Sequence, residues 1–178
     1  MDGPEKRFRQ MKRWSRVILV GAVIGSCVGC DQVTKVVAHA HLAGRAPLSF
    51  LGGIVRLSYA ENRGAFLSIG SGLPAGIRFW VFGMMVALVL ALIAARAIAD
   101  RRAGAVSVVG LAMIVGGGVG NLIDRVNAGV VRDFINIGIG SIRTGVFNVA
   151  DLAITAGAVV VAFTWRVVGK ADGPSNPI

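Results

Sequence analysis

Charged side chains are scarce in this chain of 178 residues, at 16% of the sequence, whereas about a quarter is usual in soluble domains. The chain has two cysteines and five prolines, which excludes a disulfide scaffold and a collagen-like protein. Hydrophobic residues make up 54% and the mean hydropathy is +0.70, which excludes intrinsic disorder and argues against a cytosolic enzyme. The length allows one domain, expected over residues 1–178, with its apolar surface facing lipid.

Acidic residues are few: nine, against 19 basic residues, which gives a net charge of +10. A strongly basic chain raises the question of nucleic acid. Here, however, six basic residues lie together before an apolar run, at Lys6, Arg7, Arg9, Lys12, Arg13 and Arg16. A basic flank beside an apolar segment is typical of membrane topology, so no nucleic-acid partner is expected.

Four segments are apolar enough for membrane spans, which need about 20 mostly apolar residues. They lie at about 17–36, 77–96, 103–124 and 146–167. Basic residues are denser at the termini and between the second and third spans than in the remaining connections. The positive-inside rule therefore predicts cytoplasmic termini and places 37–76 and 125–145 on the outer face.

The outer segments contain two stretches that are typical of strands. Apolar and polar residues alternate over 54–59, and 130–137 is rich in β-branched residues between Gly129 and Gly138. The predicted fold is an all-α membrane core, a four-transmembrane-helix bundle, with a small extracytoplasmic β-sheet segment between the first two spans.

Glycines recur in the first and third spans, where small residues allow close helix contacts in lipid. They are Gly21, Gly25 and Gly29 in the first, and Gly116, Gly117, Gly118 and Gly120 in the third. We expect both sets to lie at helix–helix contacts.

Three features in or near the first span suggest other chemistry. The segment ending at Cys30 is similar to a lipoprotein signal peptide, but Cys27 stands where leucine is usual and further apolar segments follow. The two cysteines form a C-x-x-C without a βαβ context, which favours apolar packing over redox chemistry. His39 and His41 lack a third ligand nearby, so no metal and no cofactor is expected.

Five acidic residues lie at the outer ends of spans or in the outer segments: Asp31, Glu61, Asp124, Asp133 and Asp151. Ionisable groups at membrane depth are costly and usually mark a functional site. Asn121 precedes Asp124, and Asn148 precedes Asp151, by three residues, a spacing that would place each pair on one helix face. Asp31 and Lys35 are likewise one turn apart.

Three alternatives stay open from the residues alone. The polar groups could simply hold the bundle together by interhelical hydrogen bonds. A serine or Ser-Lys protease could use one of the outer serines with Lys35, and a small proton-coupled transporter could use the acids as a relay. The outer serines are Ser58, Ser68 and Ser71.

Five stretches, in order, resemble the lipoprotein signal peptidase family, the bacterial signal peptidase II, an inner-membrane aspartic endopeptidase with four spans. They are DQVTK at 31–35, ENRGAF at 61–66, GNLIDRV at 120–126, VVRDFINI at 130–137 and FNVADLAI at 147–154. The resemblance implies that Asp133 and Asp151 are the catalytic pair. Residues expected to orient the site or bind substrate are Asp31, Lys35, Asn62, Gly64, Asn121, Asp124, Arg125 and Asn148.

The resemblance also implies the substrate, a diacylglyceryl-modified prolipoprotein cleaved just before its lipidated cysteine. We expect a monomer in contact with membrane lipids, with the active site near the outer face of the bacterial inner membrane. Two carboxylates that hydrolyse a peptide must share a proton, one acting as base and the other as acid. The sequence leaves open which of the two is protonated at rest, because such a pair titrates as a unit.

Overall fold

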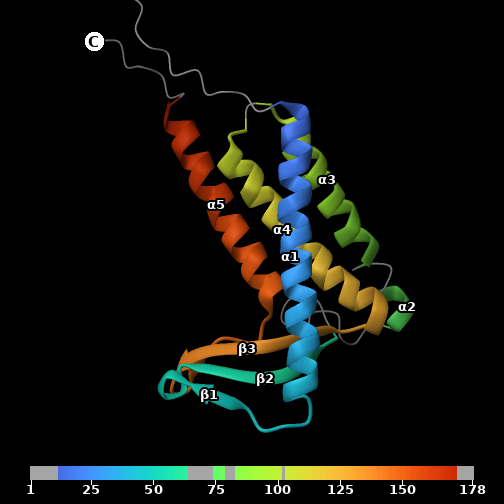
Figure 1. Ribbon diagram of the computed structural model, residues 1–178, viewed down its shortest axis with the longest axis vertical. Helices are drawn as coiled ribbons and strands as arrows, with labels where there is room; N and C mark the ends of the chain where they lie inside the picture. The colour runs from blue at the N-terminus through green and yellow to red at the C-terminus, as the bar shows by residue number, and fades with distance from the viewer. Residues whose placement is uncertain (1–11, 64–73, 79–82, 102, 172–178) are drawn as a thin grey trace, which may run out of the picture.

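Figure 1 shows the computed structural model of the protein, in which residues 12–63, 74–78, 83–101 and 103–171 are described. The helices form an elongated bundle, and a small sheet lies across one end of it. The helices are α1 Arg13–Leu42, α2 Ala75–Arg78, α3 Met85–Ala99, α4 Ala105–Ala128 and α5 Val149–Ala171. The strands are β1 Leu48–Phe50, β2 Val55–Asn62, β3 Val131–Ile139 and β4 Ile142–Arg143, with the 3-10 helix η1 at Leu51–Gly53.

The long helices coincide with the predicted spans. Among the described residues, α1 and α4 are long and apolar enough to cross a membrane, while α3 and Val149–Trp165 are shorter apolar helices. α1 extends beyond its predicted segment at both ends, over Arg13–Leu42. The second predicted span, 77–96, contains the end of α2 and most of α3, and residues 79–82 between them lie outside the described residues. A mostly helical fold with a small antiparallel sheet is confirmed, and the count of four spans stays a prediction.

The sheet joins two segments that are far apart in the sequence. Its strands run in the order β1-β2-β3-β4, and each neighbouring pair is antiparallel. β2 precedes α2 and β3 follows α4, and Figure 1 shows them side by side beneath the helices. The predicted fold placed the sheet between the first two spans, and β3, which coincides with the strand expected at 130–137, extends it beyond that segment. Pairing places Ala60 opposite Asp133 and Asn62 opposite Val131, which brings both outer segments to one site.

α4 is the central helix of the bundle and packs against α1, α3 and α5. Its glycines make these contacts close. A Cβ on Gly117 would lie 2.4 Å from the carbonyl oxygen of Ala150, and one on Gly120 would lie 2.6 Å from Asp31 Oδ2. Gly116 and Gly118 are equally constrained, so the expectation for the third span is confirmed.

The glycines of α1 do not follow this expectation. A Cβ on Gly21, Gly25 or Gly29 would meet nothing within 4 Å among the described residues, and all three are exposed. The predicted contact role was wrong for this set. The four-residue repeat places them on one face of α1, but that face points away from the bundle.

A small apolar cluster joins the sheet to the end of α1. Ala38 and Leu42 of α1 pack with Phe134 of β3, and Leu57 and Val149 lie against them. Burying these side chains holds β3 beneath the helices and directly before the start of α5. The cluster thereby fixes the position of Asp133 relative to the helix ends, because Asp133 directly precedes Phe134 in the sequence.

Candidate active site

A buried ion pair on α1 forms one wall of the polar cluster at the sheet end of the bundle. Lys35 Nζ lies 2.7 Å from Asp31 Oδ2, and both side chains are fully buried. The other carboxylate oxygen of Asp31 accepts a hydrogen bond of 3.0 Å from the backbone N–H of Ala150. Asp31 therefore joins α1 to the first turn of α5. Its position one turn before Lys35 brings the two charged groups together on α1.

Asp124 supplies a second carboxylate to the same ammonium. Its Oδ2 lies 3.1 Å from Lys35 Nζ and also accepts a hydrogen bond of 3.1 Å from the backbone N–H of Arg132. Gln32 Nε2 donates to Asp31 Oδ2 and to the carbonyl oxygen of Gly120, each at 3.1 Å. Both carboxylates around Lys35 are held in ionic pairs and by fixed donors, which suits a positioning role.

Asn121 connects this ion pair to the acids beyond it. Its Oδ1 accepts hydrogen bonds from Lys35 Nζ at 2.9 Å and from Asn148 Nδ2 at 3.0 Å. Its Nδ2 donates to Asp151 Oδ1 at 2.9 Å. The oxygen therefore faces the cation and the amide faces the carboxylate, so one side chain relays the position of Lys35 to Asp151.

Asn148 and Asp151 form the start of α5 rather than one face of a helix. Asn148 precedes the helix, and its carbonyl oxygen accepts the first helical hydrogen bond, from Leu152. Its Oδ1 accepts from the backbone N–H of Asp151 at 3.0 Å, while Asp151 Oδ2 accepts from the backbone N–H of Asn148 at 3.1 Å. This reciprocal pair is a capping box, and it fixes the Asp151 carboxylate at the positive end of the helix.

Asp133 lies on β3, across from this cap, and is 4% exposed. Asn148 Nδ2 donates to Asp133 Oδ1 at 2.7 Å. A second hydrogen bond reaches Asp133 from the side chain of Asn62, at the end of β2. Asn148 thus contacts both carboxylates, Asp151 through its backbone and Asp133 through its side chain.

The two carboxylates interact electrostatically. The pKa of Asp133 is raised from 3.8 to about 6, first by burial and then by repulsion from Asp151. Hydrogen bonds from Asn148 and Asn62, together with the charge of Lys35, oppose this rise. Burial and a neighbouring like charge disfavour the ionised form, so Asp133 holds a proton at a higher pH than an ordinary aspartate does.

Arg125 is the remaining predicted site residue on α4. It is half-buried, and its charge interacts with those of Asp151, Asp133 and Asp124. Gly129 follows the last residue of α4, and its backbone N–H donates to the carbonyl oxygen of Arg125. The φ of 70° at Gly129 ends the helix and directs the chain towards β3. Gly64, also predicted here, lies outside the described residues.

The structure brings together nine of the ten residues that the sequence suggested, and Gly64 is the one it does not describe. The contacts that sequence reasoning did not predict are backbone N–H groups, those of Arg132 and Ala150, and the bridging amide of Gln32. Backbone donors leave no signal in residue identity, but Gln32 lies inside the DQVTK stretch and could have been singled out.

Other residues considered from the sequence have separate surroundings. Glu61 is exposed and accepts a hydrogen bond of 3.1 Å from the Tyr59 hydroxyl. The His39 ring packs edge to face on Tyr59, and His41 Nδ1 donates to the Val37 carbonyl at 2.9 Å. Within the described ranges, His, Cys, Asp and Glu side chains form no group of three that could hold a metal ion.

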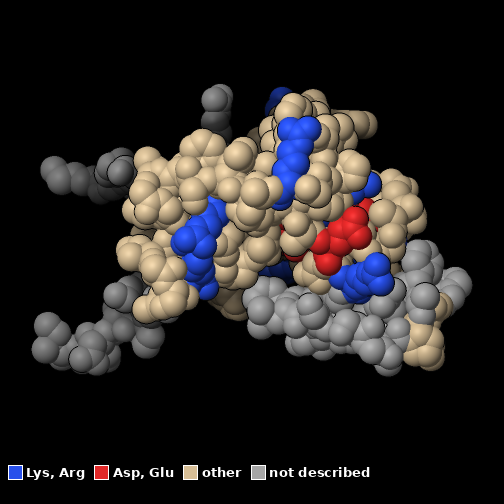
Figure 2. Space-filling view, turned by 90° about the horizontal axis from the view of Figure 1, so that it is seen from below, with Lys and Arg blue, Asp and Glu red and all other residues tan. Residues whose placement is uncertain are grey.

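Figure 2 shows the molecule from the sheet end, where acidic side chains gather at one place with basic side chains beside them. Uncharged surface covers most of the rest of the described residues that are visible on this face. A bundle of apolar helices that holds two interacting carboxylates at one end has the architecture of a membrane aspartic peptidase.

Comparison with known proteins gives the particular family. Residues 23–166 match the family model described as signal peptidase (SPase) II. The lipoprotein signal peptidase of Syntrophus aciditrophicus is 31% identical over 143 residues, which are 80% of this chain and 89% of the relative. That of Tropheryma whipplei strain TW08/27 is 37% identical over 149 residues, covering 80% and 91%. The chain therefore belongs to the signal peptidase II family, and it is an aspartic peptidase of the bacterial inner membrane.

Solved structures agree with the fold. One, described as a bacterial membrane enzyme, matches with a TM-score of 0.72 at 23% identity. The match covers 93% of this chain and 95% of the chain in that structure. A second with the same description gives a TM-score of 0.70 at 23% identity, with coverage of 89% and 96%. Identity at this level indicates a shared fold.

Proposed function

We propose that Asp133 and Asp151 are the catalytic pair and that they cleave the signal peptide of a lipidated prolipoprotein. The observation that carries this proposal is the dual contact of Asn148, which holds Asp133 Oδ1 at 2.7 Å and Asp151 Oδ2 at 3.1 Å. One rigid helix cap therefore sets the spacing of two carboxylates that belong to different segments. Paired carboxylates in such an environment are the chemical requirement for aspartic peptide hydrolysis.

The two carboxyl groups have different environments, which supports a different role for each. Both oxygens of Asp151 accept hydrogen bonds, Oδ1 from the side chain of Asn121 and Oδ2 from the backbone N–H of Asn148, so this carboxylate is arranged as an acceptor. Asp133 is buried and its pKa is raised to about 6. Asp133 therefore holds the shared proton, and Asp151 is the base.

Hydrolysis then follows from this division. Ionised Asp151 takes a proton from a water molecule that attacks the scissile carbonyl carbon, while Asp133 donates its proton to the carbonyl oxygen. Collapse of the tetrahedral intermediate requires a proton on the leaving nitrogen, and Asp151 gives it the proton taken from water. Asp133 takes a proton back from a hydroxyl group of the intermediate as the carbonyl re-forms and the C–N bond breaks, so both carboxyl groups regain their starting states.

The remaining polar residues position the pair or the substrate. Lys35, held by Asp31 and Asp124, fixes Asn121 and through it Asp151. Arg125 is half-buried beside both carboxylates, and its guanidinium donors suit a substrate carbonyl oxygen or the developing oxyanion. Asn62 donates to Asp133. Together with Gly64 these residues form the proposed orienting shell.

Four membrane spans, with the site at the outer face, fit the exposed surface of the bundle. Large apolar side chains are exposed along three helices, including Ile18 of α1, Leu92 of α3 and Phe163 of α5, each at least 61% exposed. Helices of a water-soluble protein bury such side chains, whereas lipid accommodates them. We infer cytoplasmic termini from the density of basic residues, which places the sheet and the two aspartates at the outer surface. A monomer suffices, because one chain supplies every residue of the site.

The substrate class suits this position. The relatives are lipoprotein signal peptidases, and a diacylglyceryl-modified prolipoprotein carries an apolar helix and two acyl chains. Lipid-exposed helices can accept both, while the peptide bond before the lipidated cysteine reaches water at the membrane surface. No cofactor has a role in the chemistry proposed.

The test compares three single variants of the purified chain with a lipidated prolipoprotein substrate. Asp133→Asn and Asp151→Asn each remove one carboxylate and should abolish release of the signal peptide, measured by mass spectrometry. Glu61→Gln is the matched control, because Glu61 is an exposed acid on the neighbouring strand, and it should retain activity. Retained cleavage in either aspartate variant would reject that residue as catalytic.

A further inference from the structure

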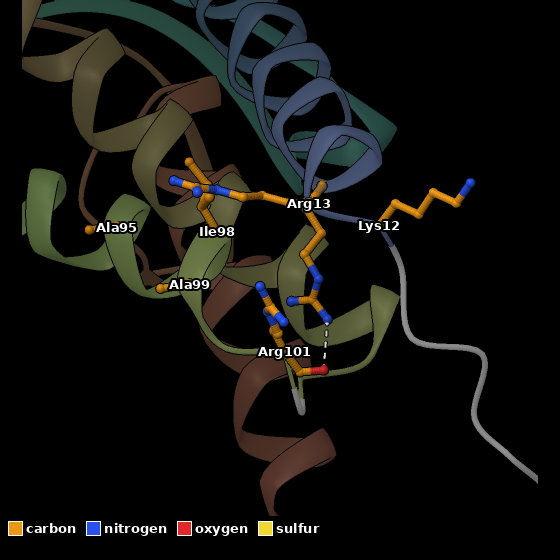
Figure 3. A pocket seen from close by; sticks show the side chains of 7 residues that line it. Lys12, Arg13, Ala95, Ile98, Ala99 and Arg101 are labelled. Carbon is orange, nitrogen blue, oxygen red and sulfur yellow. Dashed lines mark hydrogen bonds between the residues drawn. The ribbon is translucent and has the colours of Figure 1, made fainter.

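A cavity of about 790 Å³ lies between the start of α1 and the end of α3 (Figure 3). These two helix ends lie at the end of the bundle opposite the sheet (Figure 1). Four basic residues line it: Lys12, Arg13, Arg16 and Arg101. The other lining residues are apolar and belong to α3. No acidic side chain is among the described residues of the lining.

Arg16 gives this cavity a fixed positive charge. It is 2% exposed, and its guanidinium donates to the backbone carbonyl oxygens of Asp100, Arg101 and Ala103. Carbonyl oxygens are neutral acceptors, so they hold the guanidinium in place without cancelling its charge. The Asp100 carboxylate lies 3.2 Å from the Arg96 guanidinium, so this acid has a basic partner outside the lining.

One donor of Arg16 is left over. Its Nε is buried and has no hydrogen-bond partner in the part of the chain that the structure describes. Burying a charged donor without an acceptor is unfavourable, and the charge of an anion held in the cavity that Arg16 lines would offset that penalty. This group points to a ligand independently of the charge of the surrounding side chains.

The neighbouring arginines are arranged around the same space. In Figure 3, the Arg13 side chain extends across Ile98 of α3, and the Arg101 side chain points back towards α3. The Lys12 side chain points outward. Guanidinium groups match the oxygens of phosphate in pairs of parallel hydrogen bonds. The cavity is therefore suited to a phosphate group, with the buried Arg16 in its wall and the exposed side chains of Arg13 and Arg101 beside it.

The surroundings distinguish a lipid phosphate from a free ion. The two helices that form the cavity continue into exposed apolar surface, with Ile18 of α1 69% exposed and Leu92 of α3 61% exposed. A phospholipid can place its phosphate in the cavity and its acyl chains along these side chains. Basic pockets between membrane helices are known to bind anionic headgroups in this way.

We propose that the cavity formed by Arg13, Arg16 and Arg101 binds the phosphate of an anionic phospholipid in the leaflet opposite the active site. The bound lipid ties the start of α1 to the connection between α3 and α4. This proposal does not depend on the catalytic roles given to Asp133 and Asp151, which lie at the other end of the bundle.

The experiment measures lipid binding to the full chain in neutral detergent by native mass spectrometry. Phosphatidylglycerol is titrated into the wild type, into Arg13→Gln/Arg101→Gln, and into a control, Arg45→Gln/Arg56→Gln. The control removes the same two charges from exposed positions near the sheet. Phosphatidylcholine and inorganic phosphate serve as the zwitterionic and the soluble probe, and the unfolding temperature of each variant checks that it is folded.

Loss of both exposed arginines should raise the apparent Kd for phosphatidylglycerol about 30-fold, while the control changes it less than about threefold because its charges are distant. Phosphatidylcholine should bind equally weakly to all three proteins. Equal phosphatidylglycerol affinity in the wild type and the Arg13→Gln/Arg101→Gln variant would overturn the proposal. Displacement of the lipid by an equal concentration of inorganic phosphate would also overturn it, in favour of a free-anion site.

Discussion

The side-chain amide of Asn148 donates to Asp133 Oδ1 at 2.7 Å, although the two residues belong to different elements, the cap of α5 and the strand β3. The same residue caps the helix that carries Asp151. The separation of the two acids is consequently set by backbone geometry as well as by side-chain packing. A substitution at Asn148 would disturb the helix start and both acids at once.

Asp133→Asn should stabilise the protein near neutral pH while it removes activity. Because the pKa of Asp133 is about 6 in the folded chain and 3.8 in the reference state, the folded state binds the proton more tightly. Stability therefore falls as pH rises from about 4 to about 6, and the cost persists above that range. An uncharged amide avoids this cost, which is up to about 3 kcal/mol, and thermal unfolding at several pH values measures it.

The control for this effect is Glu61→Gln, which also replaces an acid by an amide but at an exposed position. We expect its stability to change by less than about 0.5 kcal/mol. At about pH 4 the Asp133→Asn variant and the wild type should unfold at similar temperatures. If the two proteins also unfolded at equal temperatures at neutral pH, ionisation of Asp133 would not destabilise the folded chain, and the prediction would be wrong.

Asn62→Ala should shift the pH dependence of cleavage upward. The Asn62 hydrogen bond lowers the pKa of Asp133, so its loss raises that pKa, and the protonated acid persists to higher pH. The alkaline limb of kcat/KM, expected near the pKa of about 6, should move up by about one pH unit. Asn127→Ala, at an exposed amide near the end of α4, should leave the limb in place. A downward shift in Asn62→Ala would contradict the donor role.

Lys35→Met should destabilise the fold strongly. The ammonium is fully buried between Asp31 and Asp124, at 2.7 and 3.1 Å, and its removal leaves two carboxylates without a cation. Breaking a buried pair in this way costs about 3–5 kcal/mol, which thermal unfolding in detergent would detect as a large drop in the transition temperature.

The matched control is Arg96→Gln, because Arg96 and Asp100 have the same i,i+4 spacing but Arg96 is 73% exposed. An exposed pair contributes at most about 1 kcal/mol, so this variant should unfold close to the wild type. If Lys35→Met and Arg96→Gln behaved alike, the buried cation would not be the element that holds α1 and α4 together.

Gly117→Ala should loosen the contact between α4 and α5. The new Cβ would lie 2.4 Å from the backbone oxygen of Ala150, which cannot rotate away as a side chain could. Forced displacement of packed elements typically costs about 1–3 kcal/mol, and because Ala150 adjoins Asp151, activity should fall as well. Gly25→Ala is the comparison: its Cβ would meet nothing within 4 Å in the described chain, so stability and activity should be unchanged.

The sequence predicted the elements whose signals are local. Long uncharged runs identified the regions of α1, α4 and α5, and alternation or β-branching identified β2 and β3. β1 and β4 have three and two residues, too few for a periodic pattern, and they exist because β2 and β3 offer edges to pair with. The spacing of the α1 glycines matched a contact motif, but the choice of face depends on the partner helix and cannot be inferred from one segment.

The candidate site was predicted as a set of residues and not as an arrangement. The resemblance to signal peptidase II indicated Asp133 and Asp151, and the spacing of Asp31 and Lys35 predicted their ion pair, which the structure contains. The Asn148–Asp151 spacing was attributed to a helix face, whereas it forms a capping box. The same three-residue separation serves both geometries, so only the position of the helix start distinguishes them.

The sheet has an implication for how the protein is made. β2 emerges from the ribosome long before β3, and the cap that joins both acids belongs to the last helix. A nascent chain inserted only as far as α4 carries neither Asn148 nor Asp151, so it lacks one carboxylate of the proposed catalytic pair and the cap that holds both. Under the proposed mechanism such a chain cannot hydrolyse the precursors around it, and the site is complete only once the start of α5 has been made.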